Sequence, residues 1–272
     1  MSLLSAHFNP KYLAIIRQLR LIDDTFFNVC FDGNIECMQL LLRIFLARDD
    51  IIVKEVITQR SAHNLYGRGV RFDVLAIDSK GKLYNVEVQR ADEGANPKRA
   101  HFNHCLIASR EIEKGTDYKN FPEVWVIFIT ENDTFGANVP MYHIERKIEE
   151  LDNQNFNDGA HTIYVNGSYR ANDAVGLLMQ DFFCPDPAKM NYPELAKRTD
   201  FFKYENKGVN AMCEIMERLQ DEGRAEGRAE GRAEGIKETA LKMLRCNESI
   251  EKIMEYTGLP VEQIKELAKQ IH

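Results

Sequence analysis

The chain has 272 residues, 44% hydrophobic and 28% charged, and its 16 Gly and 8 Pro are too few for a collagen-like or low-complexity protein. Its 42 acidic residues outnumber its 35 basic residues, and the net charge of −7 argues against a protein that simply coats nucleic acid or an anionic membrane. No apolar run approaches the roughly 18 to 20 residues of a membrane span, and charges interrupt the N-terminal stretch, so we expect a cytoplasmic protein without a signal peptide.

The first half of the chain changes from helical to strand-like spacing. Apolar side chains recur at helical intervals over 11–21 and 34–47, and Asn34 is positioned to cap the second helix. Three strands are then predicted, from a β-branched run, a nearly continuous apolar run and a period-two run, at 51–58, 70–77 and 82–90. The polar residues 78–81 predict a hairpin turn between the last two strands.

A further helix and several strands complete the predicted core. The segment 97–114 opens with Pro97 and is predicted to be helical, and 124–130 has the composition of a buried strand. Two later segments, 141–146 and 162–165, are predicted to be further strands. This order predicts an α/β fold in which helices cover the faces of a mixed sheet.

Helical patterns take over past about residue 171, and they include a repeat. The unit Glu-Gly-Arg-Ala occurs three times in 222–233 and begins again at 234–235. On a helix each unit advances about 400°, so the glycines form one row and the alanines another. Each Gly costs about 1 kcal/mol relative to Ala, and like charges meet at i,i+4. Two interpretations stay open, a solvated connector and a helix–helix contact surface.

The C-terminal residues predict a pair of short helices. Ser249 begins the first, Gly258 ends it, and Val261 begins the second, which is compatible with a helix-turn-helix element. The outward side chains of the second helix are nearly charge-balanced, so a packing or oligomerisation hairpin is equally compatible. We therefore expect a core with N-terminal helices, a helical continuation that packs on it, a repeat connector and a helical tail, at 1–170, 171–221, 222–235 and 236–272.

The predicted hairpin carries the chemistry-bearing residues. Asp73 lies on one strand, and Glu87 and Gln89 share a face of the next strand, where the hairpin register can bring Asp73 beside them. Two carboxylates at adjacent strand ends form a hard-oxygen site suited to Mg²⁺. A surface hairpin without a metal would show the same spacing.

The spacing of Asp73 from Glu87-Val88-Gln89 resembles the PD-(D/E)XK nuclease superfamily. Further segments resemble the bacterial recombination-promoting nuclease, or transposase-like, family: DDTFFNVCF, GRGVRFDVLAID, YNVEVQR, the segment 98–133 and the Glu-Gly-Arg-Ala repeats. This resemblance covers roughly residues 20 to 240. It implies a restriction-endonuclease-like mixed sheet flanked by helices, with a helical C-terminal extension.

The resemblance also implies roles for individual residues. Asp73 and Glu87 match the metal-binding carboxylates, and Val88 would contribute its backbone carbonyl. Gln89 stands where the superfamily more often has Lys, and a neutral amide can orient water by hydrogen bonding but cannot supply positive charge. Glu36 matches the helix glutamate that supports the metal or a bridging water, although a solvated helix glutamate would look the same.

Several further polar residues are candidates for DNA contact. Gln59 and Arg71 are interpreted as phosphate or water contacts, with a strand-end amide and a surface arginine as the alternatives. Basic and imidazole side chains on the following helix share one side and can face a DNA backbone, at Lys98, Arg99, His101 and His104. For the two histidines, phosphate contact or core hydrogen bonding is favoured over zinc ligation. Residues 51–104 carry nine Lys or Arg against six Asp or Glu, +3, so this segment permits phosphate contact.

The sequence therefore predicts an enzyme, a Mg²⁺-dependent DNA endonuclease that hydrolyses phosphodiester bonds, with Mn²⁺ as a substitute. Its expected partners are DNA and, for double-strand cleavage, a second copy in a homodimer; no membrane and no organic cofactor is expected. The alternative is a catalytically weak or inactive nuclease-fold module that binds DNA or protein. Strand-transfer transposition rests only on the label of the family that the chain resembles, and it is ranked below the other two because the sequence shows no RNase H-like series of catalytic acids.

Overall fold

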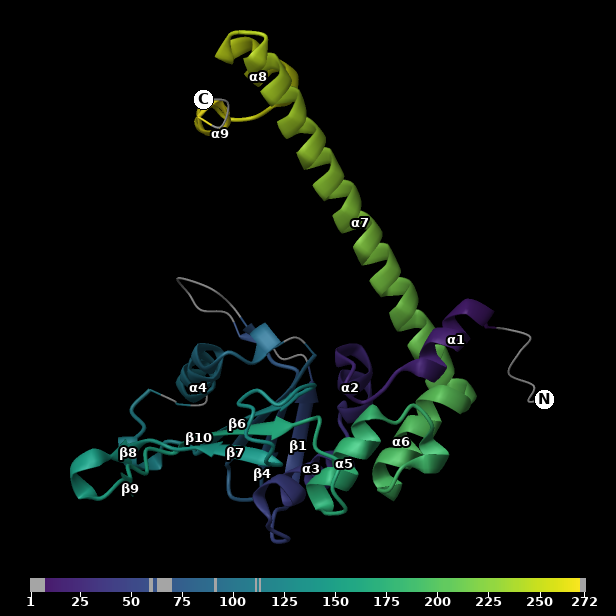
Figure 1. The fold of residues 1–272 in the computed structure, drawn as a ribbon, viewed down its shortest axis with the longest axis vertical. Helices are drawn as coiled ribbons and strands as arrows, with labels where there is room; N and C mark the ends of the chain where they lie inside the picture. The colour runs from purple at the N-terminus through teal and green to yellow at the C-terminus, as the bar shows by residue number, and fades with distance from the viewer. Residues whose placement is uncertain are drawn as a thin grey trace. The chain divides into compact units, whose positions relative to one another are not determined.

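The computed structural model describes residues 8–58, 61–62, 70–90, 92–110, 112 and 114–269 (Figure 1). The chain divides into two compact units, Met1–Asn210 and Ala211–His272. The first unit contains an α/β core and the second is helical, so the predicted fold class is confirmed.

The described part of the first unit opens with three helices, α1 (Pro10–Gln18), α2 (Asp24–Phe31) and α3 (Ile35–Leu46), where the sequence predicted two. The missed helix α2 is short and has buried side chains at five of its eight positions, so it lacks the polar face that makes helical periodicity visible. The predicted cap of α3 is confirmed, because Asn34 Oδ1 accepts a hydrogen bond from the Cys37 N–H at 3.0 Å.

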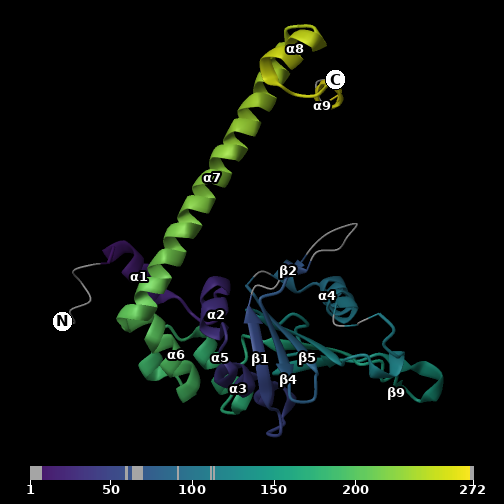
Figure 2. The ribbon, with the colours of Figure 1, turned by 180° about the vertical axis from the view of Figure 1, so that it is seen from behind.

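A mixed sheet of six strands forms the centre of the unit (Figure 2). The strand order is β1-β4-β5-β6-β10-β7, and β5, β6 and β10 run parallel while the other neighbours pair antiparallel. The helix α4 (Pro97–Arg110) lies in the crossover from β5 to β6. The strand bounds are Val53–Thr58 (β1), Val74–Asp78 (β4), Leu83–Gln89 (β5), Val124–Thr130 (β6), Met141–Ile144 (β7) and Ala160–Asn166 (β10).

The predicted single strand over 70–77 is wrong, because the chain forms two strands there. Residues Val70–Arg71 form β3, which pairs with β2 (Ser61–Ala62) in a separate sheet, and the main-sheet strand β4 begins only at Val74. A bend at Asp73 separates β3 from β4. A further small sheet pairs β8 (Lys147–Ile148) with β9 (Gln154–Asn155).

The predicted hairpin turn between β4 and β5 is confirmed. Asp78 Oδ1 accepts hydrogen bonds from the backbone N–H groups of Lys80 and Lys82 at 2.8 and 2.9 Å. Gly81 has a φ of 77°, a left-handed conformation that glycine adopts without steric cost. The turn fixes the register in which Val74 pairs with Val86.

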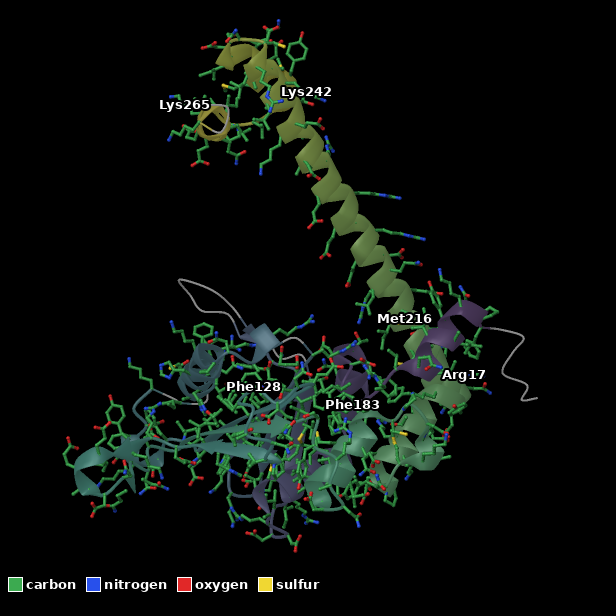
Figure 3. The ribbon with its side chains drawn as sticks, in the orientation of Figure 1. Arg17, Phe128, Phe183, Met216, Lys242 and Lys265 are labelled. Atoms are coloured by element: carbon green, nitrogen blue, oxygen red, sulfur yellow. The ribbon has the colours of Figure 1, made fainter. Side chains whose placement is uncertain are left out.

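Helices cover the sheet from both sides. The helix α4 packs against β6, over a cluster of buried side chains that includes Leu75, Val126, Phe128 and Tyr164; Phe128 is labelled in Figure 3. The helices α2 and α3 contact β1. Because side chains alternate between the faces of a strand, Ile127 and Ile129 are also fully buried, on the opposite face from Phe128.

Two helices close the first unit, α5 (Ala174–Phe183) and α6 (Pro193–Tyr204). The fully buried Asp181 carboxylate joins them, since it accepts hydrogen bonds from the backbone N–H groups of Asn191 and Tyr192 at 2.7 and 2.8 Å. The connection between the helices is therefore held by a satisfied buried charge.

The second unit consists of the greater part of α7 (Asn206–Arg245) with α8 (Ile250–Thr257) and α9 (Val261–Ala268). The repeat lies inside α7 and its side chains are exposed. The predicted tail helices are confirmed, with Ser249 Oγ accepting from the Lys252 N–H and Gly258 ending α8 at a φ of 70°. They enclose a small apolar core of Ala240, Ile253, Ile264 and Leu267. Among the described residues, no helix is long and apolar enough to cross a membrane.

Candidate nuclease site

The β4–β5 hairpin brings Asp73 and Glu87 together. The pairing of Val74 with Val86 places position 73 opposite position 87, and the Val88 N–H donates a hydrogen bond to Asp73 Oδ2 at 3.1 Å. Asp73 lines a pocket of about 300 Å³, and Glu87 is fully buried beside it. The lining residues of this carboxylate pocket are Ile22, Asp24, Asp73, Val88, Gln89, Arg90 and Arg99.

Side chains from β5 and α4 hold the Glu87 carboxylate in place. Arg99 Nη2 forms an ion pair with Glu87 Oε2, and Asn85 Nδ2 donates to Glu87 Oε1 at 3.1 Å. Asn103, one turn along α4 from Arg99, donates to Asn85 Oδ1 at 3.0 Å. Both oxygens of the buried carboxylate are therefore satisfied, as a buried charge requires.

The two carboxyl groups are close enough to oppose each other's ionisation. Burial raises the pKa of Asp73 to about 8, with further contributions from the negative charges of Glu87 and Asp24. Burial also raises the pKa of Glu87, while Arg99 acts in the opposite direction. Two buried acids with raised pKa values form a site where positive charge is stabilising.

The donor atoms of this pocket fit a hard divalent cation. No group of three or more His, Cys, Asp or Glu side chains is arranged to hold a metal within the described ranges. Mg²⁺ is commonly bound by only one or two carboxylates, with water and other oxygens completing its coordination. Asp73, Glu87 and the carbonyl of Val88 are donors of this kind, and the pKa of Asp73 is raised to about 8 by burial and by the neighbouring acids even with Arg99 close by.

Gly94 brings Gln89 and Arg99 next to each other. A Cβ atom at position 94 would lie 1.8 Å from Gln89 Oε1, so only glycine admits the present position of that amide. The Gly94 carbonyl accepts a hydrogen bond from Arg99 Nη1 at 3.0 Å. Sequence reasoning missed this residue, and its only signal is a glycine between the hairpin and the following helix.

The structure brings Asp24, and not Glu36, to the carboxylate pocket. Glu36 is exposed on α3 and is not one of the pocket residues. Asp24 is the first residue of α2, lines the pocket, and accepts a hydrogen bond from Asn28 Nδ2 at 2.7 Å. The pair of acids at 23–24 before an apolar run is a helix-start signal that could have identified α2 and this residue.

The other predicted DNA contacts lie at different places. Arg99 enters the carboxylate pocket, whereas Lys98 and His101 are exposed on α4. Arg71 is exposed in β3, so it does not share a strand face with Asp73, and Gln59 lies outside the described residues.

Arg90 is a second cation of the pocket that sequence reasoning did not single out. Its Nη1 lies 3.1 Å from Asp23 Oδ1, and its Nε donates to Glu131 Oε2 at 3.2 Å. The side chain is about half exposed at the mouth of the pocket, and its charge is paired with the carboxylates of Asp23 and Glu131.

An antiparallel hairpin with two adjacent acids, followed by a helical crossover to a parallel strand, defines a nuclease domain of the PD-(D/E)XK class. Residues 29–168 match the PD-(D/E)XK nuclease family transposase, and the chain belongs to this family. Membership implies a DNA substrate. Neither a curated protein nor a solved structure matches the chain.

Proposed function

We propose that the protein is a divalent-metal-dependent DNA endonuclease of the recombination-promoting type, which hydrolyses phosphodiester bonds. The observation that carries the proposal is the pair of a half-buried Asp73 and a fully buried Glu87, which lie opposite each other at the hairpin, with the Arg99 guanidinium paired to Glu87. Burial raises the pKa of both acids, and the charge of Glu87 adds to the shift at Asp73. Perturbed acids of this kind are typical of a functional site.

Asp73, Glu87 and the Val88 carbonyl would hold the metal. When bound, Mg²⁺, or Mn²⁺ in its place, polarises the phosphate and lowers the pKa of a water molecule. The side chains of Asn85 and Asn103 keep the Glu87 carboxylate oriented through their hydrogen bonds.

Gln89 and Arg99 together would supply the two functions that a single lysine has in the wider superfamily, orienting the water and stabilising negative charge. The Gln89 amide orients the attacking water by hydrogen bonding, and the Arg99 guanidinium supplies the positive charge that stabilises the phosphate in the transition state. Their proximity at Gly94 supports this division. Arg99 also neutralises Glu87 in the present arrangement.

Metal-dependent nicking of supercoiled plasmid by the purified protein tests the proposal. We expect nicking with Mg²⁺ and its loss on chelation, and in Asp73→Ala and Glu87→Ala variants that keep the wild-type circular dichroism spectrum. The control is Glu149→Gln, a change at an exposed acid outside the pocket, which should cleave normally. Undiminished nicking by both alanine variants would contradict the proposal.

Two substitutions of Arg99 distinguish the contribution of its positive charge from that of the guanidinium geometry. Arg99→Lys should keep part of the activity, while Arg99→Ala should lower kcat about 100-fold or more, the usual cost of removing a group that stabilises transition-state charge. Lys98→Ala, at an exposed neighbour on the same helix, should raise KM and leave kcat unchanged.

The binding-only alternative gives a different result in calorimetry. A catalytically weak module would fail to take up Mg²⁺ or Mn²⁺ at millimolar concentration, or would bind them without nicking. Gln89 in the place of a lysine is the observation that favours this alternative.

A further inference from the structure

Three arginines lie along the carboxyl edge of the parallel strands, beside the carboxylate pocket. Arg90 directly follows β5 and lines that pocket, and Arg170 follows β10 in the connection to α5. Arg20 comes from the connection between α1 and α2 and reaches the same edge, where it lies beside Glu131 at the end of β6. In open α/β sheets, ligands bind outside the carboxyl ends of the strands. We call Arg20, Arg90 and Arg170 the arginine row.

Backbone contacts hold together the strand ends that carry the arginine row. The Gly167 N–H, after β10, donates a hydrogen bond to the Thr130 carbonyl oxygen at 2.8 Å, and a Cβ at position 167 would lie 2.0 Å from that oxygen. The Glu131 N–H donates to the Gln89 carbonyl oxygen at 2.9 Å, which joins the end of β6 to the end of β5. The segments after β5, β6 and β10 therefore form one continuous edge.

Arg20 and Arg90 share two carboxylates at the mouth of the carboxylate pocket. Asp23 Oδ1 lies 3.4 Å from Arg20 Nη2 and 3.1 Å from Arg90 Nη1. The Glu131 carboxylate lies 4.0 Å from Arg20 Nη2 and 3.2 Å from Arg90 Nε. Ion pairs at the surface contribute little to stability, so a phosphate group can replace one of these carboxylates at small cost.

Arg170 supplies a positive charge that is not paired with a carboxylate in the described part of the chain. Its Nη1 donates to the carbonyl oxygens of Gly167 and Tyr169, and its guanidinium lies over the Phe183 ring, 4.5 Å from the centroid. The Arg20 guanidinium lies over the same ring at 5.5 Å; Phe183 is labelled in Figure 3. Partial burial lowers the pKa of Arg170, and no acid acts in the opposite direction. The ring and the carbonyls thus hold an exposed guanidinium without neutralising it.

We infer that Arg90, Arg20 and Arg170 bind phosphates of the DNA strand that enters the carboxylate pocket, so that this strand runs along the carboxyl edge from β5 toward β10. The inference rests on the proposed nuclease function and identifies the surface that holds its substrate. Three guanidinium groups against two shared carboxylates leave one positive charge at this edge. The guanidinium fork matches the oxygens of a phosphate, and such contacts fix the position of a strand without reading its bases.

The length of the edge fits a short stretch of backbone. Two strand spacings separate the end of β5 from the end of β10, about 10 Å. One strand of a duplex carries a phosphate for about every 3.4 Å of helix axis, so the edge spans roughly two or three phosphates. This number is comparable to the number of arginines in the row.

Binding of DNA without metal tests the arginine row separately from cleavage. A short fluorescein-labelled duplex of mixed sequence is titrated with the full chain in chelator at several salt concentrations, and fluorescence anisotropy measures the affinity. Arg170→Met keeps an apolar contact with Phe183 and removes the charge. We expect it to lower the affinity about tenfold, the effect of one lost charge-assisted hydrogen bond. The slope of log affinity against log salt concentration should fall by about one.

Removing a competing carboxylate should have the opposite effect. Asp23→Asn frees Arg20 and Arg90 from a shared partner, so binding of the same duplex should tighten by up to about fivefold, the strength of a surface ion pair. Asp50→Asn is the matched control, because it frees Arg48 at the opposite end of the hairpin and should leave the affinity unchanged. Weaker binding by Asp23→Asn would contradict competition between this carboxylate and phosphate.

Arg90→Gln gives an independent measurement at a half-exposed side chain, in case Arg170→Met lacks the wild-type circular dichroism spectrum. It should also lower the affinity about tenfold. Arg48→Met, at an arginine paired with Asp50 away from the carboxyl edge, should bind like wild type. Wild-type affinity in both Arg170→Met and Arg90→Gln, or an equal loss in Arg48→Met, overturns the inference.

Two comparisons identify the source of the phosphate. A second duplex of unrelated sequence should lose the same affinity in Arg170→Met, because backbone contacts carry no sequence information. Arginine-dependent binding to phosphatidylserine vesicles, without binding to either duplex, would overturn DNA as the partner. A failed nicking assay with arginine-dependent DNA binding would reject the nuclease function and leave the arginine row. Normal nicking with DNA binding that is insensitive to these arginines would reject the row alone.

Discussion

Asp73 and Glu87 reduce the stability of the protein in the absence of a cation. An ordinary Asp has a pKa of 3.8, and burial with the nearby acids raises the pKa of Asp73 to about 8. Between these values the folded state binds more protons than the unfolded state, so this group lowers stability as the pH rises from about 4 to 8. The effect is complete above pH 8, where the folded protein must hold both charges.

Asp73→Asn should therefore stabilise the metal-free protein while it abolishes cleavage. At pH 8 we expect the free energy of unfolding to rise by about 1 to 3 kcal/mol, because the amide removes a buried charge. At pH 4, where Asp73 is protonated in the folded state, the gain should vanish. Urea unfolding at the two pH values measures it, and a variant less stable than wild type at pH 8 would contradict the predicted repulsion.

Gly94→Ala should displace the Gln89 amide and spare the fold. The new Cβ collides with the far end of a flexible side chain, which can move at little cost, while the proposed water-orienting position is lost. We expect nicking to slow about 10-fold or more, less than the roughly 100-fold lower end for a general acid or base, because a neutral amide only orients the water. Gly223→Ala, where the added Cβ meets no atom within 4 Å, is the matched control. Equal rates for both variants would count against a role for Gln89.

The third carboxylate of the site can be assigned by comparing two helix acids. Asp24 lines the carboxylate pocket and raises the pKa of Asp73, whereas Glu36 is exposed on α3. Asp24→Ala should reduce nicking at low Mg²⁺ and Glu36→Ala should not. The reverse pattern would support the role that family resemblance gives to Glu36. Titrating Mg²⁺ in the nicking assay measures the difference as a shift in the half-saturating concentration.

At the scale of elements, α4 is held to two strands of the sheet. Arg99 and Asn103 face the hydrogen-bond network of Glu87, and His104 reaches across to Thr162 on β10. The helix is thus anchored to β5 on one side and to β10 on the other.

The stability contributed by His104, whose imidazole contacts Thr162 on β10, should depend on pH. Burial lowers the pKa of His104 from 6.5 to about 4. Between pH 4 and 6.5 the imidazole is therefore protonated in the unfolded state and neutral in the folded state. Stability from this group is complete above pH 6.5 and is lost as the pH falls toward 4, by about 3 kcal/mol in total. Urea unfolding at pH 7 and pH 5 should show a smaller decrease for His104→Gln than for wild type. Equal decreases would contradict a buried neutral imidazole.

Short-range pattern predicted the elements that carry the carboxylates. Period-two spacing predicted β5, and the turn at 78–81 predicted the meeting of Asp73 with Glu87. The apolar run over 70–77 located β4 but not its start, because Asp73 lies in a bend before it. The helix α2 was missed because its buried surface leaves no polar face, and Asp24 was missed with it. Gly94 was missed because its importance depends on where the Gln89 side chain lies, which no local spacing encodes. The contact of His104 with Thr162 likewise depends on strand order, which brings β10 beside β6.

At the scale of the whole molecule, the two units are stabilised differently. The first has a buried core on both faces of its sheet, whereas the second has one small cluster around Ile253 and Ile264. The repeat between 222 and 235 is exposed on every side, so its helicity depends on intrinsic propensity and on surface ion pairs such as Arg218 to Glu222 at 3.8 Å. Such pairs contribute little, and local opening of this segment should precede global unfolding.

Replacing repeat glycines by alanine should therefore stabilise α7 alone. Gly227→Ala and Gly231→Ala place the new Cβ where no atom lies within 4 Å, and each removes about 1 kcal/mol of helix cost. In hydrogen exchange, amides of the repeat should gain protection, while those of β6 should not change. Gly208→Ala is the matched control on the same helix, because its Cβ would meet the Phe201 carbonyl oxygen at 2.1 Å, and it should destabilise the protein instead. Unchanged protection in the repeat after both alanine changes would mean that something other than propensity limits this helix, such as contact with a second chain.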